Sequence, residues 1–154
     1  MEIAQYLKHM SNDHLSDDTK GKVRQMLREI SELESVGDAC CNLARTLNNH
    51  PELIHEHAHH FHSNLVSMMD VTDKALTQMN VVMSGSLRNR NVDDTYRLEH
   101  DINEMRRKLK KDNIRAVDDH EYDYALGTYY NDFINECEKL GDYVVNVVQA
   151  RFGI

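Results

Sequence analysis

Two stretches of this 154-residue chain decide the fold: Ile30–Thr46 reads ISELESVGDACCNLART, and Ile134–Ala150 reads INECEKLGDYVVNVVQA. With Ile134 aligned on Ile30, both follow the pattern E-x-E-x-x-G-D-x-x-x-N. Apolar residues recur three and four positions apart in each stretch, which predicts two amphipathic helices. A glycine inside a helix costs about 1 kcal/mol relative to alanine, so its recurrence at one place indicates that another group approaches closely there.

The same periodicity predicts four long helices along the chain. One proline and six glycines are too few turn-forming residues for a multi-stranded β fold. The predicted helices span roughly residues 19–48, 52–84, 94–117 and 121–152, with Asp17 or Asp18 and Asp93 as N-caps. Short connections make neighbours antiparallel. We therefore expect an all-α, up-down bundle of about four helices forming one domain over residues 1–154, with the first ten residues as the tail of an earlier helix.

Composition excludes several classes of protein. The 26 acidic residues against 18 basic ones give a net charge of −8, which argues against nucleic acid as a partner. Three cysteines, two of them adjacent, form no disulfide framework, and the N-terminus carries no export signal. These features favour a cytoplasmic location. Nucleophile and phosphate-loop motifs are missing from the sequence, so we do not expect an enzyme.

The acidic residues of the repeat suggest a metal site. Glu34 with Asp38, and Glu138 with Asp142, are like-charge pairs one helical turn apart, and each pair destabilises its helix by a few tenths of a kcal/mol unless a cation lies between them. Glu99 and Asn103 repeat this spacing on the 94–117 helix, and His62 lies level with Asp38 across the turn at Pro51. Oxygen ligands with an occasional imidazole suit Mg, Mn, Fe or Zn. The sequence thus predicts up to two sites at the rim of the bundle.

At these residues the chain resembles the PhoU family, whose repeat of three helices ends in an E-x-x-G-D motif. The motif stands here as Glu138-Lys-Leu-Gly-Asp142 and as Glu34-Ser-Val-Gly-Asp38. The stretches MMDVTDKAL, beginning at Met68, and EHDIN, beginning at Glu99, follow in the family's order. Residues 52–152 therefore resemble one complete repeat, and residues 1–50 resemble the closing helix of a preceding one. Ser35 and Asn103 depart from the family pattern, which has a basic residue and often an aspartate there.

This resemblance implies a regulator of phosphate uptake that binds iron or zinc clusters through Glu34, Asp38, Glu138 and Asp142, with Glu99 and Asn103 as further ligands. Within the family, the chain looks most like the cytoplasmic tail of bacterial sodium/phosphate cotransporters. The implied location is the inner face of the membrane, as part of a longer membrane protein. The implied partners are the transporter's membrane portion or other transport and sensor proteins, and a homodimer is compatible with the sequence.

Other interpretations stay open on the residues alone. A di-metal carboxylate enzyme on a four-helix bundle is one, since Glu56 precedes His59 by three residues, and a plain helical interaction domain is another. His55, His59 and His62 fall on one helix face and offer imidazole ligands. The basic run from Arg106 to Arg115 is typical of a solvated helix end or of a contact with anionic lipid.

Overall fold

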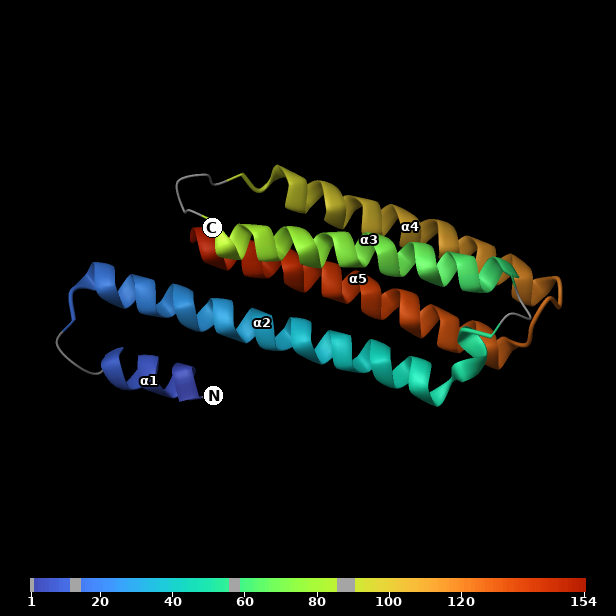
Figure 1. The fold of residues 1–154 in the computed structure, drawn as a ribbon, viewed down its shortest axis with the longest axis horizontal. Helices are drawn as coiled ribbons and strands as arrows, with labels where there is room; N and C mark the ends of the chain where they lie inside the picture. Colours follow the sequence, from blue (N-terminus) through green and yellow to red (C-terminus); the bar gives the residue numbers. More distant parts are fainter. Residues whose placement is uncertain (1, 12–14, 56–58, 86–90) are drawn as a thin grey trace.

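The computed structural model describes residues 2–11, 15–55, 59–85 and 91–154, and every regular element in these ranges is a helix. The elements are α1 (Glu2–Ser11), α2 (Asp17–Asn49), the short 3-10 helix η1 (Pro51–Leu53), α3 (His59–Ser84), α4 (Asp93–Asp118) and α5 (Tyr124–Phe152). The predicted all-α bundle of four long helices is confirmed, and the short N-terminal helix precedes it (Figure 1).

Helix α5 lies at the centre of the bundle. It packs against α2 on one side and against α3 and α4 on the other, while α3 and α4 also pack against each other (Figure 1). Its buried side chains include Phe133, Ile134, Leu140 and Val144, each with at most 1% of its surface exposed. The packing of α2 is almost entirely on α5 rather than on α3, although α3 follows it in the sequence. Sequence neighbours are therefore not all spatial neighbours in this bundle.

The helix ends differ from those predicted at several points. Ser16, not Asp17 or Asp18, caps α2, and its hydroxyl accepts from the Thr19 amide. The third helix begins at His59 instead of at residue 52, because Pro51 starts only a single 3-10 turn. At α4 the predicted cap Asp93 is already helical, and its backbone amide donates to the Asn91 side chain.

The two repeated stretches lie side by side and antiparallel in α2 and α5. The Asn146 amide of α5 donates to the Glu32 carboxylate of α2 at 3.1 Å, and the Asn42 amide of α2 donates to the Glu136 carboxylate of α5 at 3.0 Å. The first glutamate of each stretch thus pairs with the last asparagine of the other. This reciprocal arrangement gives the helix pair an approximate two-fold symmetry, and it accounts for two of the repeated positions by structure alone.

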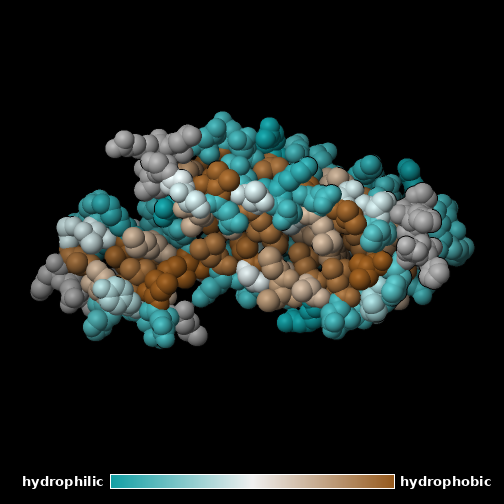
Figure 2. Space-filling view, viewed as in Figure 1, coloured by the Kyte–Doolittle hydropathy of each residue, from teal (hydrophilic) through white to brown (hydrophobic). Residues whose placement is uncertain are grey.

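The periodicity predicts an apolar face of α2 that includes Val23, Gly37, Cys41 and Ala44, and of these only Val23 is buried. Val36 and Ala39 are buried, whereas Gly37, Cys41 and Ala44 are exposed. Figure 2 shows apolar side chains gathered along the middle of the molecule, bordered by a hydrophilic edge where α4 lies. None of the helices in the described ranges combines the length and the apolar character that a membrane crossing needs.

Candidate metal centre

The acidic residues of α4 and α5 form one cluster across the helix pair. On α4, the Asn103 amide donates to the Glu99 carboxylate. On α5, the Glu138 carboxylate lies 3.8 Å from the Arg106 guanidinium, which reaches over from α4. Asp142, one turn beyond Glu138, feels the charges of both glutamates and of Arg106. Four of the seven predicted metal ligands therefore lie on the facing sides of α4 and α5, but the described side chains do not gather three acids around one point.

The charges within this cluster affect the protonation of Asp142. Asp142 is exposed at the surface, but its surroundings remove part of the hydration of its carboxyl group and raise its pKa, and the charges of Glu138 and Glu99 raise it further. The Arg106 guanidinium opposes these effects without cancelling them. A carboxylate whose neighbours raise its pKa lies in excess negative potential, which a bound cation would relieve.

Glycine explains how α4 comes close enough to α5 for these side chains to meet. A Cβ atom at Gly141 would lie 2.9 Å from the Cδ1 atom of Ile102, which is buried in the α4–α5 interface. Near the other end of the same interface, a Cβ atom at Gly127 would lie 2.6 Å from Val117. The close approach that the repeated glycine predicts is therefore real at Gly141. It also exists at Gly127, which the repeat does not mark.

The α2 half of the repeat is arranged differently. Glu34, Gly37 and Asp38 are exposed, and a Cβ atom at Gly37 would meet nothing within 4 Å. His62 is exposed on α3, and α2 makes little contact with that helix. The expected convergence of Asp38 with His62 is not seen, because α5 separates the two halves of the bundle. In this half no second helix covers the acids in the part of the chain that the structure describes.

The ranges that the structure describes hold no group of three or more His, Cys, Asp or Glu side chains positioned to bind a metal ion. In the α4–α5 cluster Arg106 takes the place of a cation beside Glu138. The donor chemistry fits a hard or borderline divalent ion, since Glu99, Glu138 and Asp142 supply carboxylate oxygens and Asn103 an amide oxygen. For these oxygens to surround a metal ion, the Arg106 side chain has to move away.

Arg106 is the residue of this cluster that the sequence interpretation missed. It follows Glu99 by seven positions and Asn103 by three, which places all three on one face of α4. That spacing was available in the sequence. The residues of the basic run have different partners: Arg106 and Lys110 both donate at 3.3 Å to the Asn135 side chain of α5, whereas Arg107 pairs with Glu104.

The three histidines His55, His59 and His62 do not all lie on one helix. His55 lies before α3, outside any helix, so the predicted alignment of residues 55, 59 and 62 along one helix is wrong. His62 is exposed on α3. Glu56 lies outside the described residues, and so does the Glu56–His59 pair on which the enzyme alternative depends.

Comparison with known proteins adds no assignment to this geometry. No family model, no curated protein and no solved structure matches the chain.

Proposed function

We propose that this chain is a PhoU-like regulatory module that binds divalent metal ions and controls phosphate uptake. The observation that supports the metal-binding half is the placement of Glu99, Glu138 and Asp142 on the facing sides of α4 and α5, with Asn103 bonded to Glu99 and Arg106 beside Glu138. Loss of hydration, and then the charges of Glu138 and Glu99, raise the pKa of Asp142 there. Such a cluster costs stability while it is empty, and a cation recovers that cost. Iron, zinc and manganese are the ions whose ligand preferences fit these oxygens.

The phosphate-uptake half of the proposal rests on the sequence resemblance. The E-x-x-G-D motif occurs twice, as Glu34–Asp38 and as Glu138–Asp142, and the helices α3, α4 and α5 follow the order of one PhoU repeat. In this proposal the module acts through contacts with a membrane phosphate transporter or its sensor proteins, at the inner face of the membrane. Metal binding sets the charge and the rigidity of the α4–α5 face that makes those contacts.

Calorimetric titration tests the metal site. Fe(II), Mn(II) and Zn(II) are titrated separately into the wild-type chain, the double variant Glu138→Gln with Asp142→Asn, and the control Asp73→Asn, which changes an exposed acid on α3. Wild type and control should bind at least one of the ions with the same affinity, and the double variant should lose that binding. Indistinguishable isotherms for all three proteins would refute the α4–α5 site. A second double variant, Glu34→Gln with Asp38→Asn, measures the contribution of α2 separately.

Phosphate transport tests the regulatory half. The initial rate of phosphate uptake is measured in cells that produce the full-length protein as wild type, as the Glu138/Asp142 double variant, or as Asp73→Asn. The double variant should change the uptake rate and the control should not. Equal rates in all three strains, together with intact metal binding in vitro, would leave a metal-binding protein without this role.

Two observations favour a plain helical interaction domain as the second candidate. Arg106 already neutralises part of the cluster, and the reciprocal Glu–Asn pairs explain two repeated positions without any ligand. If none of the three ions binds to the wild-type chain, this candidate replaces the metal-binding one.

A further inference from the structure

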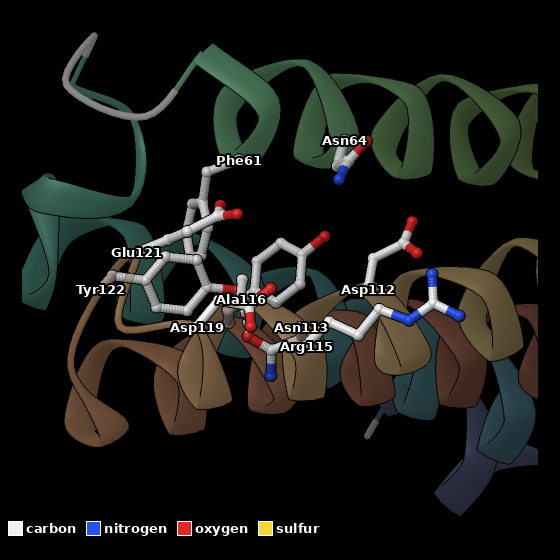
Figure 3. A pocket seen from close by; sticks show the side chains of 10 residues that line it. Phe61, Asn64, Asp112, Asn113, Arg115, Ala116, Asp119, Glu121 and Tyr122 are labelled. Atoms are coloured by element: carbon white, nitrogen blue, oxygen red, sulfur yellow. Dashed lines mark hydrogen bonds between the residues drawn. The ribbon is translucent and has the colours of Figure 1, made fainter.

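A cavity of about 330 Å³ opens between α3, α4 and α5 beside the turn at residues 119–123, at the opposite end of α4 from Glu99 (Figure 3). Its volume falls in the range of small-molecule sites, about 300–1,000 Å³. Three aromatic side chains, Phe61, Tyr122 and Tyr130, form its apolar wall. The Phe61 ring packs against both tyrosines, with centroid separations of 4.8 Å to Tyr122 and 4.2 Å to Tyr130, so the wall is held rigidly.

Tyr130 places an unpaired polar group in this cavity. The residue is 1% exposed, and its hydroxyl makes no hydrogen bond of good geometry to any described residue. Burial raises the pKa of this hydroxyl, and a weaker hydrogen-bonding interaction with the nearby Asn64 side chain lowers it by a smaller amount. A buried hydroxyl without a partner costs free energy, and such groups in native proteins call for an explanation such as a ligand.

The hydroxyl of Tyr122, the other tyrosine of the wall, already has a hydrogen-bond partner. Tyr122 donates to the Asn113 side chain, whose amide in turn donates to the Gly127 carbonyl at 3.0 Å. Burial, with the charges of Glu121 and Asp112, raises the pKa of Tyr122 to about 12. Asp112 lines the same cavity as both tyrosines, and its charge also raises the pKa of Tyr130. In Figure 3 Asn64 projects from α3 and Asp112 from α4 toward each other across the cavity.

The charged residues around the cavity indicate whether a ligand should be a cation or an anion. Asp112, Asp119 and Glu121 contribute three carboxylates, and Arg115 contributes one guanidinium. Arg115 lies three residues after Asp112 and four before Asp119, so its charge is compensated along the chain. The charges of the lining residues therefore sum to −2, which disfavours phosphate and favours a cation. Aromatic walls also attract cations and accommodate alkyl chains.

We infer that this cavity binds a small aliphatic ammonium compound, whose nitrogen donates to the Asp112 carboxylate and to the Tyr130 hydroxyl while its carbon chain contacts the aromatic wall. The site is separate from the Glu99–Asp142 cluster and does not depend on metal binding there. The Tyr130 hydroxyl distinguishes it from a merely acidic surface, because this buried group makes no hydrogen bond of good geometry to the described residues and an ammonium group would supply one.

Titration calorimetry with 1,4-diaminobutane tests this inference on the full chain, with 1,4-butanediol as the uncharged analogue and inorganic phosphate as the anion. The wild-type protein should bind the diamine saturably at one site, and neither the diol nor phosphate should bind. Asp112→Asn and Tyr130→Phe should each weaken binding about tenfold, as expected for the loss of a hydrogen bond to a charged group. Circular dichroism checks that both variants remain folded.

Asp101→Asn is the matched control, because it removes an exposed acid from the same helix without touching the cavity. The control should bind the diamine as the wild type does. Three results would overturn the inference: no saturable diamine binding, equal weakening in the control, or binding of phosphate in place of the diamine. Equal weakening would mean that the acidic protein attracts amines over its whole surface.

Discussion

Gly37 and Gly141 occupy the same position in the two repeated stretches but have opposite surroundings. A side chain at Gly37 would extend into open space, whereas one at Gly141 would press on Ile102 in the α4–α5 interface. Gly37→Ala should therefore stabilise the protein by up to about 1 kcal/mol through helix propensity. At Gly141 the same gain is opposed by an overpacking cost of about 1–3 kcal/mol, so the net effect should be destabilising.

Urea denaturation of both variants measures this difference directly, and each serves as the control for the other. The free energy of unfolding of Gly37→Ala should exceed that of Gly141→Ala. Equal values would mean that Ile102 moves aside at no cost, or that Gly37 is covered in solution. Ile102→Val, which shortens the opposing side chain, should reduce the penalty at Gly141.

Asp142 makes a separate prediction about pH. Its folded-state pKa is raised, so the native protein holds this proton more tightly than the unfolded chain does. The contribution of Asp142 to the free energy of unfolding therefore falls as the pH rises through the interval between its unfolded and folded pKa values. Asp142→Asn should raise the free energy of unfolding at pH 7, and the gain should vanish below about pH 4, where the carboxyl is protonated in both states. Denaturation at several pH values checks this.

The control for this titration is Asp73→Asn on α3, an exposed acid outside the cluster. Its stability difference from the wild type should vary less with pH. A metal ion reverses the sign at Asp142: with a bound divalent ion present, the aspartate should stabilise and the asparagine variant should be the weaker protein. A gain from Asp142→Asn that persists at pH 3 would contradict the assignment of the effect to ionisation.

Between helices, the reciprocal Glu–Asn pairs join α2 to α5. Glu32 and Asn146 are both partly buried and 3.1 Å apart. A double-mutant cycle with Glu32→Ala and Asn146→Ala should give a coupling energy of about 1 kcal/mol, the usual net value of one hydrogen bond. Glu34→Ala, at an exposed site two residues away, should change stability by less than about 0.5 kcal/mol. A coupling energy near zero would show that water replaces this pair without loss.

For the helices, the sequence predicts their positions in the chain better than which side of each helix is buried. The long periodic stretches locate α2, α4 and α5 to within about three residues, because periodicity is a local property. The buried face of α2 is harder to predict, since this helix carries apolar residues on more than one side and only α5 decides which side is covered. The predicted start of α3 at residue 52 is wrong because Pro51 fits the first turn of a 3-10 helix as well as that of a longer α-helix.

Across the whole molecule, topology decides which acids meet. Glu99 and Asp142 are almost equidistant from the turn between α4 and α5, so their proximity follows from an antiparallel hairpin and was predictable. The pairing of Asp38 with His62 assumed the same hairpin geometry for α2 and α3. It fails because α2 packs on α5, across the bundle, and a single sequence does not contain that choice of neighbour.

The central position of α5 predicts unequal local stability. Since α5 packs against three long helices, its amides should exchange with solvent only through global unfolding. Helix α1, whose main packing partner among the described elements is α2, buries Leu7 and should open independently. Hydrogen exchange measured by mass spectrometry should show α1 exchanging orders of magnitude faster than residues 133–148. Phe133→Ala should lower global stability by about 3–5 kcal/mol, because it leaves a cavity at the centre of the core. Leu7→Ala should accelerate exchange in α1 and leave α5 protected. Equal protection of α1 and α5 would instead show that the N-terminal helix folds cooperatively with the bundle.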